Sequence, residues 1–128
     1  MFLYKVEVKT ANNPRMGLGL FAKEFIPKNS IVWKFIEGID IKISIDELNK
    51  LNDAQKEYFY KYGWIEKNEN NFYYSSGDLT NFMNHSYTPN ITIKNEFSVS
   101  VKDIDIDEEL FIDYSNFCLD FDASKVTE

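Results

Sequence analysis

Histidine and cysteine are nearly absent from this sequence, which contains one of each among 128 residues, His85 and Cys118. A lone cysteine excludes a disulfide or a thiolate zinc cluster within the chain, and it is typical of a reducing compartment. A lone histidine excludes a metal site built from several imidazole ligands. We therefore expect an intracellular protein that holds no metal.

Long hydrophobic runs are also missing. No apolar stretch approaches the ~18 residues of a transmembrane helix, and residues 1–9 alternate apolar and charged side chains instead of forming a signal peptide. Hydrophobic residues still make up 44% of the chain and aromatic residues 16%, enough to form a core. These features predict a soluble globular protein with a single domain over residues 1–128 and no membrane partner.

Positive charge is scarce. The formal net charge is −7, and residues 103–128 carry nine acidic side chains against the single Lys125. Such a surface repels phosphate backbones and attracts cationic partners. Direct nucleic-acid binding is therefore not expected, whereas a peptide rich in lysine or arginine is an expected partner. An acidic composition also simply keeps a small domain soluble, and this explanation stays open.

Most of the chain has the pattern of short strands separated by turn-forming residues. Side chains alternate between apolar and polar in several of these runs, as in a half-buried strand. The predicted strands are 2–8, 20–25, 31–35, 72–74, 91–93, 97–101 and 110–112. Residues 94–96 have the composition of a hairpin loop between two of them.

The middle of the chain predicts a helix instead. Ser44 and Glu47 have the spacing of a capping box, and Gly63 provides a stop. Between them, apolar residues recur at helical spacing, so we place one helix at about 45–62. Many short strands with one inserted helix indicate an α+β domain that is mostly β.

Gly17, Leu18 and Gly19 lie after a proline-containing loop and before a predicted strand. A dinucleotide fingerprint needs the reverse order, a strand before and a helix after, so that interpretation fails. Two glycines around one residue allow the main chain to approach a ligand closely. A plain tight turn between strands explains the same residues.

His85 and Tyr114 are the other candidate site residues. His85 lies in the segment Asn-Phe-Met-Asn-His-Ser-Tyr-Thr-Pro-Asn at 81–90, and Tyr114 ends the segment Asp-Glu-Glu-Leu-Phe-Ile-Asp-Tyr at 107–114. The histidine is either part of a polar ligand site or a packed core imidazole. The tyrosine either aligns a substrate amine or closes the core with its hydroxyl bonded to main chain.

Together and in this order, the segments 15–22, 81–90 and 107–114 resemble the glycine, Asn-His-Ser and Glu-Glu-Leu-x-x-x-Tyr motifs of the SET-domain protein-lysine methyltransferases. The resemblance implies a fold of several small β-sheets in which the last two motifs form a C-terminal pseudoknot. It places a motif-bearing core at about 6–114, an insert at about 37–71 and a short tail at 115–128.

The resemblance also implies a site and an activity. S-adenosyl-L-methionine would bind against Gly17, Leu18 and Gly19 and against Asn84 and His85. The catalytic residue would be Tyr114, and the reaction would be methyl transfer to the ε-amine of a lysine in a basic protein such as a histone. A non-catalytic module that binds basic peptides is the alternative, and a homodimer that completes the peptide groove is a further expectation.

The chain departs from the family pattern at several positions. Tyr87 stands where many relatives have a zinc-binding cysteine, and the cysteine-rich tail that shares this zinc is missing too. Asp107 replaces a frequent glycine, which aspartate tolerates because it adopts left-handed geometry more easily than most residues. The substrate channel would then be lined differently, or the same residues would simply pack the core. The candidate channel residues are Tyr87, Ile112, Phe117 and Phe121.

Overall fold

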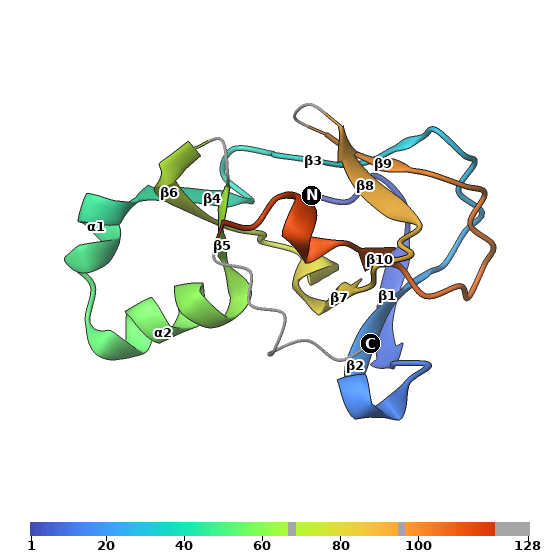
Figure 1. Ribbon diagram of the computed structural model, residues 1–128, viewed down its shortest axis with the longest axis horizontal. Helices are drawn as coiled ribbons and strands as arrows, with labels where there is room; N and C mark the ends of the chain where they lie inside the picture. The colour runs from blue at the N-terminus through green and yellow to red at the C-terminus, as the bar shows by residue number, and fades with distance from the viewer. Residues whose placement is uncertain (67–68, 95–96, 120–128) are drawn as a thin grey trace.

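The part of the chain that the structure describes forms three small β-sheets and a helical insert (Figure 1). The computed structural model describes residues 1–66, 69–94 and 97–119, and Phe121 therefore lies outside the described residues. Within these ranges the chain forms mostly short strands, which confirms the predicted α+β class with a predominance of β. No helix in this part of the chain is long and apolar enough to cross a membrane.

The first sheet is an antiparallel pair of β1 (Val6–Thr10) and β2 (Leu18–Ala22). A loop with the short 3-10 helix η1 (Pro14–Met16) joins them. β2 begins next to the glycine turn, and four of its five residues are buried. A strand that is buried from Gly19 onward holds the preceding turn in a fixed position.

The second sheet has five strands in the order β3 (Ile31–Lys34), β9 (Phe97–Ser100), β8 (Ile91–Lys94), β10 (Phe111–Ile112) and β7 (Asn84–His85). β8 and β9 pair antiparallel with Lys94 opposite Phe97, which confirms the predicted hairpin, although residues 95–96 lie outside the described ranges. β10 lies between β7 and β8 and runs parallel to both. The two motif-bearing segments are therefore neighbours in one sheet.

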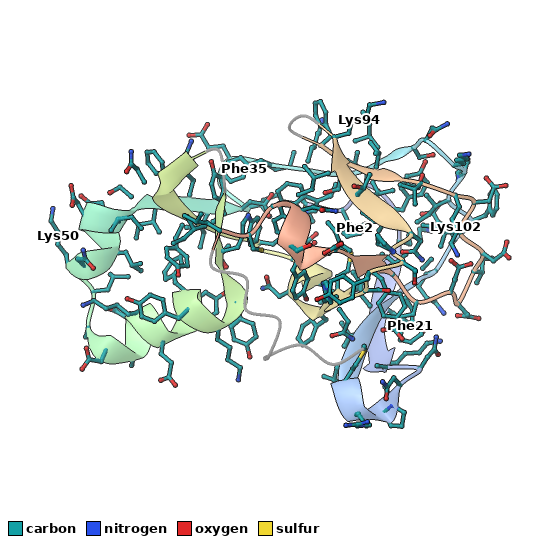
Figure 2. The ribbon with its side chains drawn as sticks, viewed as in Figure 1. Phe2, Phe21, Phe35, Lys50, Lys94 and Lys102 are labelled. Atoms are coloured by element: carbon teal, nitrogen blue, oxygen red, sulfur yellow. The ribbon has the colours of Figure 1, made fainter. Side chains whose placement is uncertain are left out.

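The third sheet has the order β4 (Ile41–Ser44), β6 (Glu69–Ser75) and β5 (Trp64–Glu66). It lies with α1 (Ile45–Asn49) and α2 (Asp53–Tyr62) at one end of the molecule, on the left in Figure 1. In Figure 2, Lys50 marks the outer end of this insert, far from Phe21 on β2. Leu48, Phe59 and Tyr73 form a small core of their own there.

The prediction of one continuous helix over 45–62 was wrong, because the segment forms two helices. Ser44 does cap α1, as its side chain accepts a hydrogen bond from the Glu47 N–H. A second start follows at Asn52, whose side chain accepts from the Gln55 N–H while the Gln55 side chain accepts from the Asn52 N–H. Gly63 ends α2 in an extended conformation, at φ −95°.

The Asn52→Ala variant is expected to lose about 1 kcal/mol of unfolding free energy, because the start of α2 loses its reciprocal cap. Urea unfolding measured by circular dichroism checks this. Glu57→Ala, an exposed change within the same helix, should stay within about 0.5 kcal/mol of the wild type. Equal losses for the two variants would contradict the role of the cap.

Strand prediction was correct for the hairpin, and the predicted strands 31–35, 72–74 and 110–112 correspond to β3, β6 and β10. Elsewhere it was incomplete. The predicted strand 2–8 begins only at Val6, and the predicted strand 20–25 is Leu18–Ala22. Two strands of the insert, β4 and β5, and the two-residue β7 were not predicted. β7 exists only because β10 pairs with it, and such long-range pairing leaves no local pattern.

The main core joins the first two sheets. Its fully buried side chains include Leu20, Ile26, Val32, Ile91, Ile104 and Leu110. Burying each of these side chains contributes about 1.5–3 kcal/mol. Because this core underlies β2, β8 and the segment before β10, it sets the relative positions of the three motifs.

Candidate functional site

The glycine turn is held by main-chain hydrogen bonds at both ends. The Gly17 N–H donates to the Pro14 carbonyl at 3.1 Å, and the Gly17 carbonyl accepts from the Ala11 N–H at 2.8 Å. Gly17 has φ +74°, a left-handed conformation that favours glycine. No atom lies within 4 Å of where a Cβ of Gly17 would be, so the turn borders open space. Leu18 beside it is 50% exposed.

Asn84 ties this turn to the Asn-His-Ser segment. Its side-chain nitrogen Nδ2 donates to the Leu18 carbonyl at 2.9 Å. The same residue pairs with Phe111 in the parallel ladder of β7 and β10. One asparagine therefore contacts both of the other motif-bearing segments.

Glu109 is part of the same cluster, although sequence reasoning did not select it. Its side chain is buried, Oε1 accepts from the Asn12 N–H at 2.8 Å, and Oε2 accepts from Asn84 Nδ2 at 3.3 Å. A Cβ on Gly19 would lie 2.7 Å from Oε2, so the close approach of β2 requires glycine there. The position of Glu109 in the acidic motif was a signal that could have been used to select it. Its contacts with Asn12 and Asn84 could not be read from the sequence.

Asn90 was missed for the same reason. It is buried, its Nδ2 donates to the Glu109 carbonyl at 2.8 Å and to Glu108 Oε2 at 3.0 Å, and its Oδ1 accepts from the Phe111 N–H at 2.8 Å. The side chain thus replaces main-chain pairing at the start of β10. Its position directly after Pro89, at the end of the motif, was the signal in the sequence.

His85 is buried and contacts the start of the 3-10 helix η3 (Tyr114–Asn116). Its Nδ1 accepts from the Tyr114 N–H at 3.0 Å, so this nitrogen carries no proton. The imidazole also lies edge-on to Tyr87, with ring centroids 4.4 Å apart, and its centroid is 5.3 Å from that of the Tyr114 ring. The fold therefore brings the predicted histidine and tyrosine into direct contact.

The Tyr114 hydroxyl donates to the Met83 carbonyl, one residue before Asn84. Burial raises the pKa of the Tyr114 phenol to about 12, with a smaller contribution from the nearby Cys118 thiol. This main-chain bond is the one expected of a structural tyrosine. The position of the ring against His85, between the Asn-His-Ser segment and the tail, is what makes Tyr114 a candidate catalytic group.

Replacing Tyr114 by phenylalanine is expected to remove the phenol that titrates near pH 12, above the ordinary value of 10.0. Because the folded pKa is raised, the stability that goes with the neutral phenol is present below pH 10 and is lost between pH 10 and about 12. Ultraviolet difference titration of the two proteins at 295 nm checks this. If the titration step that the variant lacks lies near pH 10 in the wild type, the Tyr114 phenol is not buried as described.

The candidate channel residues surround this ring unequally. Phe117 contacts Tyr114 edge-on with centroids 6.2 Å apart, and its centroid is 6.0 Å from that of Trp64 in the insert. Ile112 is buried and pairs with His85 across the ladder, while Tyr87 is 51% exposed. Phe121 lies outside the described residues. The described part of the tail thus folds back over the site.

A main-chain hydrogen bond fixes the end of this tail segment. The Leu119 N–H donates to the Ile65 carbonyl on β5 at 2.7 Å. Aromatic contact continues from Trp64 to Tyr74, whose stacked rings have centroids 5.9 Å apart. The insert and the tail together therefore form an aromatic wall beside Tyr114.

Asp107 has φ +68°, which confirms the left-handed geometry expected at this glycine-like position. Its N–H donates to the Ala22 carbonyl at 2.8 Å. Its carboxylate lies 3.5 Å from Lys9 Nζ and 3.5 Å from Lys23 Nζ. These exposed contacts join the acidic turn to β1 and to the end of β2.

Comparison with known proteins adds independent evidence. A family model described as SET domain matches residues 17–115, a range that includes the glycine turn, the Asn-His-Ser segment and Tyr114. No curated protein sequence matches the chain significantly. S-adenosylmethionine is the cofactor of SET-domain methyltransferases, and one of the similar structures is bound to it.

Solved structures with the same fold come from polycomb repressive complex 2. An active complex in the basal state is 24% identical with a TM-score of 0.65, over 87% of this chain and 15% of that chain. An autoinhibited ctPRC2 bound to S-adenosylmethionine is 22% identical with a TM-score of 0.68, over 91% of this chain and 16% of that chain. An inhibitor-bound humanized mutant of the Chaetomium thermophilum complex is 23% identical with a TM-score of 0.68, again over 91% of this chain and 16% of that chain.

This chain spans about one sixth of the length of those matched chains, so the likeness concerns one domain of them. The TM-scores show a shared fold. In this chain that fold consists of small sheets, with β10 between β7 and β8. The SET fold inferred from the three motifs is thus confirmed, with two helices in the insert instead of one. On this evidence the chain belongs to the SET domain family.

Proposed function

We propose that this chain transfers a methyl group from S-adenosyl-L-methionine to the ε-amine of a lysine in a protein substrate. One observation carries the proposal: three motifs that are far apart in the sequence meet around Asn84 and His85. Asn84 Nδ2 bonds the Leu18 carbonyl at 2.9 Å, and His85 Nδ1 accepts from the Tyr114 N–H at 3.0 Å. Membership of the SET domain family supports the same chemistry.

The residues present fit the cofactor. Open space borders the left-handed Gly17, and Leu18 and Gly19 offer main-chain groups next to it. Asn84, which bonds the Leu18 carbonyl of this turn, and the neighbouring His85 would complete the binding surface. When bound, S-adenosyl-L-methionine supplies a methyl group on a positively charged sulfur.

Tyr114 would orient the substrate amine. Its hydroxyl donates to the Met83 carbonyl, so the phenol oxygen keeps lone pairs that can accept an N–H from the amine. Such a bond restricts the direction of the nitrogen lone pair, and positioning of this kind converts binding into rate.

Desolvation at the same place would favour the neutral amine. The burial that raises the pKa of the Tyr114 phenol to about 12 disfavours charge at this position. Burial lowers the pKa of an ammonium for the same reason, so a lysine that enters beside this ring loses its proton more readily. The chain would then need no strong base, and none of its residues is assigned that role.

The substrate would approach over the aromatic wall formed by the insert and the tail. Tyr87, Ile112 and Phe117 would line the channel for the lysine side chain, and Phe121 remains a sequence-based candidate. The net charge of −7 favours a basic protein, for example a histone. We also propose that residues 1–128 act as one domain, with the core, insert and tail at the boundaries given above.

Methyl transfer to protein tests the proposal directly. Purified protein is incubated with S-adenosyl-L-methionine carrying a labelled methyl group and with core histones or a cell lysate, and mass spectrometry identifies the modified residues. The expected result is label on lysine side chains. A wild-type protein that binds no cofactor and labels neither histones nor lysate would contradict the proposed function.

Calorimetry separates this enzyme from a non-catalytic module that binds basic peptides, which the acidic charge also favours. A methyltransferase should bind S-adenosyl-L-methionine on its own. Peptide binding by a protein that shows no heat with the cofactor would favour the module. Light scattering on the same samples measures whether the protein forms the homodimer expected from the sequence.

A further inference from the structure

Glu109 carries a buried carboxylate that the proposed reaction does not use. The residue is 1% exposed, and its two oxygens accept from the Asn12 N–H at 2.8 Å and from Asn84 Nδ2 at 3.3 Å. Both partners are neutral donors. The negative charge is therefore surrounded by N–H groups within the cluster that joins the glycine turn to Asn84.

No lysine or arginine of the described residues forms a salt bridge with this carboxylate. Lys9, opposite Gly19 in the β1–β2 pair, instead lies 3.8 Å from Glu7 and 3.5 Å from Asp107. A buried charge is costly unless it is paired, and hydrogen bonds from neutral donors compensate only part of that cost. A cation that binds next to this cluster would supply the missing countercharge.

The carboxylate lies directly behind the proposed cofactor surface. Gly19 approaches it so closely that a Cβ would lie 2.7 Å from Oε2, and Asn84 Nδ2 divides its hydrogen bonds between Oε2 and the Leu18 carbonyl. Two residues of the proposed cofactor surface, Gly19 and Asn84, therefore lie against this carboxylate. A positively charged ligand on that surface would be attracted by this carboxylate, because a buried charge is screened less than one in water.

We infer that Glu109 sets the specificity of this site for the cationic cofactor over its neutral product, a step that rests on the proposed function. The two ligands, S-adenosyl-L-methionine and S-adenosyl-L-homocysteine, differ by one methyl group and by the positive charge on sulfur. A fixed negative charge stabilises the cation selectively, so the site is expected to bind S-adenosyl-L-methionine more tightly than S-adenosyl-L-homocysteine. Glu109 acts here as a positioning and specificity residue and does not touch the reacting atoms.

A purely structural role would have a different signature. If Glu109 only holds Asn12 and Asn84 in place through hydrogen bonds, replacing it should lower the binding affinity for the two ligands by equal factors. The two ligands share the same adenosine and amino-acid parts. If its charge matters, the ratio of the two dissociation constants should change. This ratio is measured by calorimetry and does not depend on catalytic activity.

The experiment compares Glu109→Gln with Glu109→Asp. The glutamine variant removes the charge at nearly constant volume and is expected to lower the preference for the cation by about threefold to tenfold. The aspartate variant keeps the charge and should keep the preference, even if both ligands bind less tightly. Glu108→Gln is the matched control, since it removes a charge from the neighbouring residue, whose carboxylate bonds Asn90 Nδ2.

The outcomes are distinct. An unchanged ratio in Glu109→Gln would overturn the inference. If that variant does not fold, wild-type protein still tests it, because equal affinity of the wild type for the two ligands would overturn it as well. Failure of the wild type to bind either ligand would overturn the proposed function and this inference together, whereas a loss of preference only in Glu109→Gln supports both.

Discussion

The Tyr114→Phe variant is expected to lower kcat for methyl transfer by about 100-fold or more, with cofactor affinity changed by less than about twofold. The ring stays in place against His85 and Phe117, because phenylalanine keeps the same packing surface. What is lost is the hydroxyl that bonds the Met83 carbonyl and would orient the amine. Steady-state kinetics, followed by the formation of methylated peptide, give kcat. Calorimetry gives the dissociation constant of the cofactor.

Stability should change little in this variant, by about 1 kcal/mol for one hydrogen bond. The control is Tyr60→Phe, which removes the same atom from a ring that is 56% exposed on α2. It should leave kcat unchanged. A Tyr114→Phe protein that is folded, binds cofactor and retains most of the wild-type rate would show that the tyrosine is structural only.

The Gly77→Ala variant is expected to lose about 3 kcal/mol of unfolding free energy, which lowers Tm by about 10 °C in a domain of this size. The added Cβ would lie 1.8 Å from the Ile39 carbonyl oxygen and 2.8 Å from its carbon, and main chain cannot rotate away as a side chain can. Relief requires moving the turn around Ile39. That movement would also stretch the bond from the Gly77 N–H to the buried Asp40 carboxylate, now 3.1 Å.

Differential scanning calorimetry measures this loss, and Gly38→Ala is the comparison. Gly38 has φ +88° but open space around its Cβ position, so alanine there costs only the backbone strain, about 1–2 kcal/mol. The order of the two variants is the test. If Gly38→Ala were the less stable protein, steric overlap at Gly77 would not be the dominant effect.

The helical insert shows where local sequence signals reach their limit. Ser44 was recognised as a cap because a serine followed by glutamate three residues later is a local pattern. The break at Asn52 also had a local signal, the pair of Asn52 and Gln55, but the apolar spacing continued across it and suggested one helix. Helical periodicity reports which side is buried, and two helices that bury the same side look continuous.

The cluster around Glu109 shows a different limit. Its partners Asn12 and Asn84 lie 97 and 25 residues away along the chain. No periodicity or spacing in the sequence relates such residues, since their contact depends on how β2 and β7 are brought together by the core. Glu109 and Asn90 were therefore missed although both lie inside motifs that were identified.

The sequence by itself determined the family of this protein, because its three motifs consist of residue types whose order and spacing are recorded in the chain. It also predicted the left-handed backbone of Asp107, since backbone preference is a local property. Only the tertiary structure decided that β10 lies between β7 and β8, that Tyr114 contacts His85, and that a buried carboxylate supports the glycine turn. Those arrangements arise from packing and strand pairing between segments that are distant in the sequence. The free energy that stabilises them is gained only when the core is assembled.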